Sequence, residues 1–113
     1  MKCFVTGASG FVGANLVHEL LGQGHRVSVL VRSDSDLSGL GAADCEIVTG
    51  SLSEPESYRE ALSECEWCFH VAASYHLWLS DYRPMYEANV EGTRHLLQTA
   101  IDAGCQRIVY TST

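Results

Sequence analysis

The 113-residue sequence has little positive charge: Lys2 is its only lysine, and six arginines bring the basic total to 7 against 14 acidic residues. Nucleic-acid binding requires clustered lysine and arginine to neutralise phosphates, so we expect no nucleic-acid partner. The sequence also lacks an apolar run long enough to span a membrane, and the first apolar stretch is interrupted at Thr6 and Gly7 before a signal-peptide core could form. These absences predict a cytoplasmic protein with no membrane partner.

The sequence lacks a recognisable disulfide framework, because its five cysteines are an odd number and no export signal accompanies them. Cys65 and Cys68 have the C-x-x-C spacing of redox pairs. The segment that begins at Trp67 has the pattern of a strand, so no helix N-terminus would lower a thiol pKa there. A zinc half-site would need a second such pair or a histidine cluster. We therefore expect these cysteines to be structural and predict no metal site.

A glycine-rich segment at residues 6–13 directly follows the apolar run at residues 3–5. Gly7 would allow a sharp turn from strand to helix, Gly10 would leave room for a pyrophosphate near the backbone, and Gly13 would let the helix pack closely on the strand. The free N–H groups and the dipole of the first helical turn favour a bound phosphate. A purely structural turn is the alternative. The predicted cofactor-binding residues of this loop are Gly7, Ser9, Gly10, Phe11, Val12 and Gly13.

Strands and helices alternate along the whole sequence, which predicts one α/β domain over residues 1–113. The expected architecture is a Rossmann-type, doubly wound parallel sheet with strand order 3-2-1-4-5. The predicted strands are residues 2–6, 26–31, 46–49, 67–72 and 107–111.

Helices are predicted at residues 10–23, 53–63 and 84–103, and residues 33–41 are predicted to be a loop with at most a short helix. The second helix has the start signals Ser53 as N-cap, Pro55 in the first turn and Glu56 three residues after the cap. Periodicity places an apolar stripe on the first helix at Phe11, Leu16, Val17, Leu20 and Leu21. The long third helix has two apolar stripes, the second formed by Val90, Leu97 and Ile101.

Three motifs extend the glycine signal: Thr-Gly-x-x-Gly-x-x-Gly at residues 6–13, Phe-His-Val-Ala-Ala at residues 69–73 and Asn-Val-Glu-Gly-Thr at residues 89–93. Together they resemble the extended branch of the short-chain dehydrogenase/reductase superfamily. The sequence is most similar to NAD(P)-dependent sugar epimerase/dehydratases, especially hopanoid-associated sugar epimerases, and to dihydroflavonol-reductase-like enzymes. The resemblance implies hydride transfer with NADP or NAD on a small-molecule substrate, a sugar or a ketone.

The resemblance also implies roles for residues outside the glycine loop. Ala72 and Ala73 would lie against the riboses of the cofactor, and Asn89 would face the sheet near it. Ser51 and Leu52 stand where the family commonly has Gly-Asp-Leu, so adenine recognition through Ser51 should be weaker than usual while Leu52 can still pack on the base. His70 is expected to be a hydrogen-bonded core residue.

Arg32 follows the second predicted strand, where NAD-binding family members usually present an acidic residue to the adenosine ribose. A guanidinium fits a 2′-phosphate far better than a neutral hydroxyl pair, so Arg32 favours NADP over NAD. Two alternatives remain open at this point. Arg32 could be a solvated strand end, and Asp34 or Asp36 could serve the ribose.

The superfamily's chemistry depends on a Tyr-x-x-x-Lys pair, which this sequence cannot supply because Lys2 is its only lysine. Thr113 falls where the family has its catalytic Ser or Thr. The sequence therefore looks like an N-terminal portion, truncated after strand five, that binds the dinucleotide weakly and is inactive alone. The exposed last strand predicts self-association, and the long helix makes a homodimer possible. A non-catalytic NADP-binding sensor or scaffold is the alternative; a flavodoxin-like domain fits the alternation but not the glycines.

Overall fold

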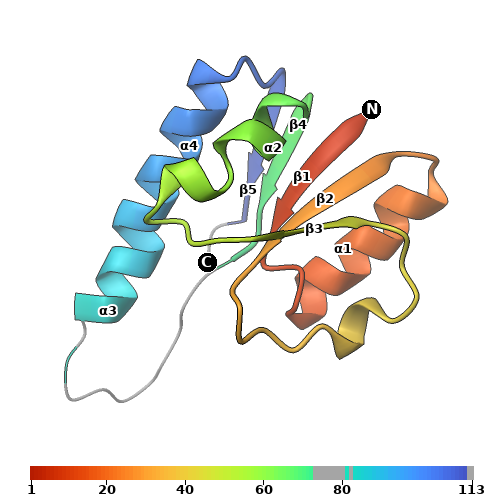
Figure 1. Ribbon diagram of the computed structural model, residues 1–113, viewed down its shortest axis with the longest axis horizontal. Helices are drawn as coiled ribbons and strands as arrows, with labels where there is room; N and C mark the ends of the chain where they lie inside the picture. The colour runs from red at the N-terminus through yellow and green to blue at the C-terminus, as the bar shows by residue number, and fades with distance from the viewer. Residues whose placement is uncertain (73–80, 82, 112–113) are drawn as a thin grey trace.

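A computed structural model describes residues 1–72, 81 and 83–111 of the chain. Five parallel strands form one sheet in the order β3-β2-β1-β4-β5, which confirms the predicted order 3-2-1-4-5 (Figure 1). Strands β4 and β5 end before the predicted boundaries, β4 because the amide of Ala72 donates to the Thr6 hydroxyl oxygen at 3.1 Å. The strands are β1 (Lys2–Thr6), β2 (Arg26–Val31), β3 (Glu46–Thr49), β4 (Trp67–His70) and β5 (Arg107–Tyr110).

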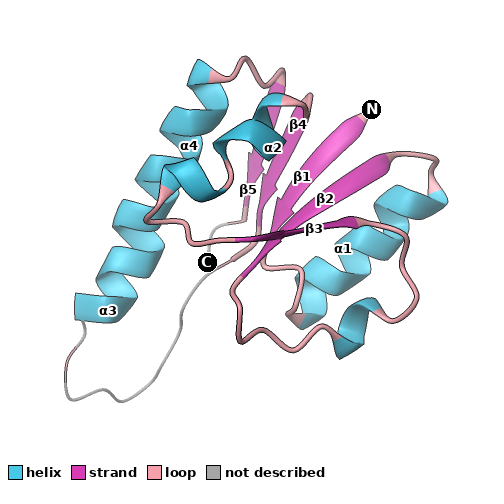
Figure 2. Cartoon of the chain, viewed as in Figure 1, coloured by secondary structure: helices cyan, strands magenta, loops and turns pink. Residues whose placement is uncertain are grey.

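Helices cover both faces of the sheet (Figure 2). Helix α1 (Phe11–Gly22) packs on one face, and α2 (Arg59–Ser63) and α4 (Gly92–Asp102) pack on the other. Strand β1 is buried between these layers: Cys3 and Val5 join the core under α1, and Phe4 joins the core under α2 and α4. Burial on both sides explains why this strand is a continuous apolar run rather than an alternating one.

The predicted helix at residues 53–63 is wrong in its first half. Residues Pro55–Ser57 form a 3₁₀ turn (η2), and α2 begins only at Arg59. Ser53 does not cap a helix; its amide and hydroxyl both contact the Ser51 hydroxyl, at 3.4 and 3.0 Å. The interruption falls at Tyr58, whose buried side chain donates its hydroxyl proton to the Leu52 carbonyl at 3.0 Å. The helix is therefore interrupted at the residue whose ring is buried in the core.

The other helices depart from prediction in their details. The predicted helix at residues 84–103 consists of α3 (Arg83–Tyr86), a π-helical turn η3 (Glu87–Glu91) and α4. A short 3₁₀ turn, η1 (Ser38–Leu40), lies within the loop after β2, as predicted. The expectation that Phe11 belongs to the core stripe of α1 is wrong, since its side chain is 87% exposed.

The second apolar stripe of the long helix is not buried by its own chain at Ile101, which is 63% exposed, and Val90 is also exposed. Strand β5 lies at the edge of the sheet, with Val109 and Tyr110 exposed. These exposed apolar residues are the features from which self-association and a possible homodimer were predicted. Both stay predictions. Among the described residues, no helix is long and apolar enough to cross a membrane.

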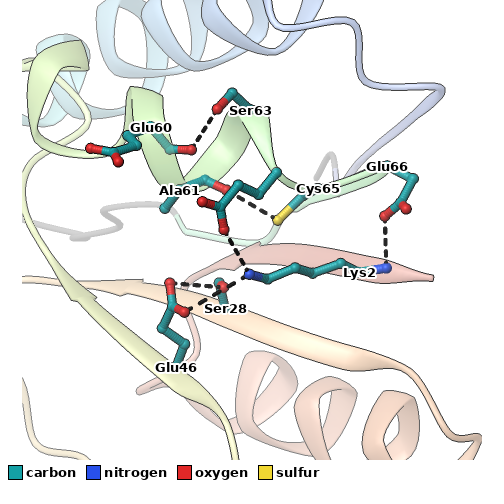
Figure 3. Close-up of polar contacts among 9 residues, drawn as sticks. Lys2, Ser28, Glu46, Glu60, Ala61, Ser63, Cys65 and Glu66 are labelled. Atoms are coloured by element: carbon teal, nitrogen blue, oxygen red, sulfur yellow. Dashed lines mark hydrogen bonds and ion pairs between the residues drawn. The ribbon is translucent and has the colours of Figure 1, made fainter.

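Lys2, the only lysine of the chain, lies at the amino-terminal ends of the strands and contacts acidic residues there (Figure 3). Lys2 Nζ lies 3.1 Å from Glu64 Oε2 and 3.8 Å from Glu46 Oε2, and its side chain is only 11% exposed. The Lys2 amide donates to Glu66 Oε2 at 2.8 Å. Because the strands are parallel, the glycine loop after Thr6 lies at the other end of the strands, where their carboxyl-terminal residues meet.

Candidate functional site

Gly7 begins the turn that leaves β1 and lies against the end of β4. Its φ angle of +78° is in the left-handed region that glycine alone adopts readily. A Cβ at this position would lie 2.6 Å from the Ala72 amide nitrogen and 2.8 Å from the Val71 carbonyl carbon. The backbones of the loop and of β4 are therefore in direct contact, and no side chain fits between them.

The other two glycines of the loop have different steric surroundings. A Cβ on Gly13 would collide with the carbonyl group of Gly7, so this glycine is required for α1 to pack against the turn. A Cβ on Gly10 would make only ordinary contact with the Gly7 oxygen, at 3.5 Å, and the φ of Gly10 is −85°. The fold requires glycine at Gly7 and Gly13, whereas at Gly10 the open space faces outward.

Helix α1 begins immediately after Gly10, and its first amides have no hydrogen-bond acceptor among the residues that the structure describes. The first amides of an α-helix have no acceptor within the helix, and the N-cap here is a glycine that has no side chain to receive them. No acidic residue lies in the first turn. Ser9 is exposed, Phe11 is 87% exposed and Val12 is 59% exposed. The site thus combines free amides, a helix dipole and uncovered side chains at one sheet edge, which suits an anionic ligand with an apolar portion.

Two hollows lie near the carboxyl-terminal ends of the strands, and the glycine loop lines the first of them. The first, of about 250 Å³, lies between the start of α1 and η1, and the second, of about 480 Å³, lies between the ends of β2 and β3. The second hollow brings together the predicted residues Arg32 and Ser51 with Asp34 and Glu54. Glu54 was not predicted, since it precedes Pro55 in a segment that the sequence marks only as a helix start. Asn15 and His18 of the first hollow were also missed, because they are polar positions on the exposed side of an amphipathic helix.

Local hydrogen bonds shape the second hollow. The Arg32 amide donates to Ser35 Oγ and the Ser35 amide donates to the Arg32 carbonyl, both at 3.0 Å, so the chain turns sharply while the guanidinium stays exposed. The Ser51 amide donates to Ser57 Oγ at 3.1 Å. The carboxylate of Asp36 accepts the amide of Ser38 at 3.0 Å, which lowers the pKa of Asp36 and engages it within its own loop. Asp34, not Asp36, lines the hollow beside Arg32.

His70 is the last residue of β4 and is completely buried. Its Nδ1 lies 2.7 Å from Thr6 Oγ1 and its Nε2 lies 2.8 Å from Thr93 Oγ1, so both ring nitrogens have partners on other elements. The ring of Tyr110 stacks on it, with centroids 5.3 Å apart. Burial lowers the pKa of His70 to about 4, so the ring is neutral at pH 7. His70 is a hydrogen-bonded core histidine as predicted, but Thr6 and Thr93 were not identified as its partners.

The remaining predicted residues lie as follows. Ala72 is half-buried against Gly7, Leu52 is half-buried against the core under α2 and α4, and Asn89 is half-buried in the π-helical turn η3. Ala73 and Thr113 lie outside the described residues. Cys65 and Cys68 are buried free thiols, and burial raises the pKa of each to about 12. No group of three histidine, cysteine or acidic side chains within the described ranges is placed to hold a metal ion.

Residues 3–113 match the model of the NAD-dependent epimerase/dehydratase family. The chain belongs to this family. It is 40% identical over 112 residues to the sterol demethylase protein B of Methylococcus capsulatus, covering 99% of this chain and 34% of that protein. It is 37% identical over 113 residues to a Stigmatella aurantiaca protein named 4-hydroxy-2-methyl-3-oxo-4-farnesyl-3,4-dihydroquinoline-1-oxide ketoreductase, covering all of this chain and 34% of that protein. The chain therefore spans about a third of the length of these relatives.

Solved structures of family members show the same fold. The Thermus thermophilus UDP-glucose 4-epimerase in complex with NAD superposes with a TM-score of 0.87 at 27% sequence identity, and the match covers this whole chain and 38% of that one. A Rossmann-like nucleotide fold, a nicotinamide-dependent enzyme family and the short-chain dehydrogenase/reductase resemblance are therefore confirmed. The descriptions of the family and of the epimerase complex both mention NAD, and neither tells whether this chain prefers NADP or NAD.

Proposed function

We propose that this chain is the dinucleotide-binding portion of an extended short-chain dehydrogenase/reductase that acts by hydride transfer as a sugar epimerase/dehydratase or as a ketone reductase. The observation that carries the proposal is the difference among the three glycines. Gly7 and Gly13 are required by the packing of the chain itself, while the missing Cβ of Gly10 leaves open space beside the free amides of α1. Such space is what a diphosphate needs to approach the backbone.

In this proposal the chain's own groups bind and orient the cofactor. The amides of Phe11 and Val12 point from the helix N-terminus to the diphosphate, and the exposed Ser9 lies beside them. Ala72 and Ala73 border the riboses, Asn89 faces the cofactor, and Ser51 with Leu52 borders the adenine. The bound nicotinamide would accept or return the hydride, and Thr113 would polarise the substrate carbonyl or hydroxyl. Those two roles require the parts of a longer protein that bring a substrate.

Gly10→Ala tests the proposal directly. A new methyl group there would contact only the Gly7 oxygen, at 3.5 Å, so thermal unfolding should shift only by the small cost of replacing an N-cap glycine with alanine. Binding of NADP or NAD, measured by calorimetric titration, should weaken at least about tenfold because the methyl occupies the diphosphate's place. Gly22→Ala is the matched control, since a Cβ on Gly22 meets no atom within 4 Å and Gly22 lies at the far end of α1. Unchanged dinucleotide affinity in Gly10→Ala would contradict the proposal.

Arg32 supports a preference for NADP. Its exposed guanidinium borders the hollow between β2 and β3, where a 2′-phosphate on the adenosine ribose would lie. Asp34 and Glu54 border the same hollow, and their carboxylates oppose a phosphate while suiting a ribose hydroxyl. Arg32→Asp should therefore reverse the preference from NADP to NAD. Arg26→Asp, the same charge change at the other end of β2, is the control; equal affinity of the unmodified chain for both dinucleotides would remove the case for Arg32.

The unmodified chain is expected to bind a dinucleotide without sustained turnover, because the only lysine is engaged with Glu64 and Glu46 at the opposite edge of the sheet. Mixing the chain with NADPH and candidate sugars or ketones, and following absorbance of the reduced nicotinamide, measures this. Sustained turnover would contradict it. Binding without turnover in the longer protein as well would instead support the non-catalytic sensor or scaffold.

A further inference from the structure

The hydrogen bonds around Thr6 fix the protonation of the His70 ring. The amides of Val71 and Ala72 both donate to Thr6 Oγ1, each at 3.1 Å. A hydroxyl oxygen has two lone pairs: the Ala72 amide uses one, and the Val71 amide, which also donates to the Thr6 carbonyl at 3.3 Å, uses the other. The one hydroxyl proton of Thr6 therefore points to His70 Nδ1, 2.7 Å away, and Nδ1 must be unprotonated to accept it.

The opposite ring nitrogen follows from this assignment. A neutral imidazole carries its single proton on the nitrogen that does not accept, so Nε2–H of His70 donates to Thr93 Oγ1 at 2.8 Å. The result is a directed chain of hydrogen bonds from the two amides that follow β4 through Thr6 and His70 to Thr93. This chain joins β1, β4 and α4, and it is hereafter called the His70 relay.

The His70 relay ends at atoms that border the proposed dinucleotide site. The Ala72 amide it holds is the atom closest to a Cβ built on Gly7, at 2.6 Å, so its position sets how near the loop approaches β4. At the other end, Thr93 lies one helical turn after Asn89 in the continuous path from η3 into α4. The carbonyl of His70 also accepts the Thr111 amide at 3.1 Å, which places the end of β5.

We propose that His70, held as the Nε2–H tautomer between Thr6 and Thr93, is a positioning residue that sets the spacing of Gly7, Ala72 and Asn89 around the bound dinucleotide. It touches neither cofactor nor substrate, and it acts through the amide of Ala72 and through Thr93. The inference rests on the proposed function for the ligand, but the tautomer and the hydrogen bonds can be measured without any ligand.

The first measurement is the ring itself. Nitrogen-15 NMR of the unliganded chain at pH 7 should show His70 with a protonated Nε2 and an unprotonated Nδ1, and Thr6→Val should disturb that signature by removing the hydroxyl proton. The Ala72 amide should exchange slowly with deuterium in the unmodified chain and faster in Thr6→Val. An Nδ1–H tautomer would overturn the proposal.

The second measurement is dinucleotide affinity in variants that divide the relay. Thr6→Val removes both the acceptor of the Ala72 amide and the donor to His70, and we expect about tenfold weaker binding from the loss of a buried hydrogen bond. Thr6→Ser keeps the hydroxyl and should restore affinity to within about twofold. His70→Asn places an amide oxygen near the Nδ1 position and retains the Thr6 bond, whereas His70→Gln reaches Thr93 and loses it. His70→Asn should therefore bind the dinucleotide more tightly than His70→Gln.

The control is Thr99→Val, which removes a buried hydroxyl from the same α4 helix but outside the relay. If Thr6→Val binds no more weakly than Thr99→Val at equal thermal stability, His70 is only a core residue and the proposal is overturned. Should Thr6→Val not fold, the pair His70→Asn and His70→Gln decides, and equal affinities would overturn it. If the unmodified chain binds no dinucleotide, the proposed function fails, while the ring signature and the Ala72 exchange rate still decide whether the His70 relay exists.

Discussion

His70 makes the stability of the protein depend on pH, because its pKa differs between the folded and the unfolded chain. In an unfolded chain a histidine takes up a proton near its ordinary pKa of 6.5, whereas burial lowers the pKa of folded His70 to about 4. Between these values the unfolded state binds more protons than the folded state, so acid favours unfolding. The stability that His70 contributes is present above pH 6.5 and is lost as the pH falls toward 4.

The size of the effect follows from the two pKa values. One pKa unit corresponds to about 1.4 kcal/mol, so the full difference is worth roughly 3 kcal/mol, of which roughly 2 kcal/mol is lost between pH 7 and pH 5. The ring is completely buried, so solvent does not screen this contribution. Most carboxylates are still ionised at pH 5, which keeps their contribution small in this window.

The assay is urea unfolding of the unmodified chain and of His70→Asn at pH 7, 6 and 5, followed by tryptophan fluorescence. His70→Asn cannot take up a proton and keeps an acceptor for the Thr6 hydroxyl. We expect the free energy of unfolding of the unmodified chain to fall by about 2 kcal/mol more than that of His70→Asn between pH 7 and pH 5. Parallel pH profiles would refute the reasoning, since they would mean that folded His70 titrates like an unfolded one.

Three further perturbations have expected outcomes. Gly7→Ala should lower the free energy of unfolding by at least about 2 kcal/mol, because it combines a positive φ with a backbone collision, while Gly22→Ala should not destabilise; similar denaturation midpoints would contradict this. Cys65 and Cys68, whose pKa burial raises to about 12, should react with iodoacetamide at pH 8 far more slowly in the folded than in the unfolded chain, as mass spectrometry can check. Tyr58→Phe should cost about 1 kcal/mol in urea unfolding, because its hydroxyl donates to a backbone carbonyl from a buried position; an unchanged midpoint would argue against that bond.

The sheet could be predicted from the sequence because its central strands β1 and β2 are buried on both faces. Strand β1 shows this most clearly: Cys3 and Phe4 join different cores, so residues 3–5 are all apolar and the strand is visible as a continuous run. The strand order followed from the alternation with helices, since parallel strands require crossovers. The apolar runs of the strands and their alternation with helical segments are both local patterns, so they can be recognised in the sequence.

The helices were predicted less well, because their details depend on contacts between distant residues. Ser53 carries the start signals of a helix, but its amide donates to the Ser51 hydroxyl oxygen and the Tyr58 ring is buried in the core. The first turn is therefore a 3₁₀ turn. Phe11 continues the apolar period of α1, yet it is exposed because the helix begins at the loop and not over the sheet. In both cases local propensity indicated one structure and tertiary packing determined another.

The site divides along the same line. The position of the loop could be predicted because glycine spacing is a local signal, and the position of Arg32 because it directly follows a strand; their roles in binding stay predictions. The partnership of Thr6, His70 and Thr93 was not, since these residues are separated by 64 and 23 positions. The strand register pairs Thr6 with His70, and the packing of α4 on the sheet brings Thr93 to the same ring. A sequence shows which residues can contact a ligand, but the residues that hold those contacts at the right spacing become visible only in the folded chain.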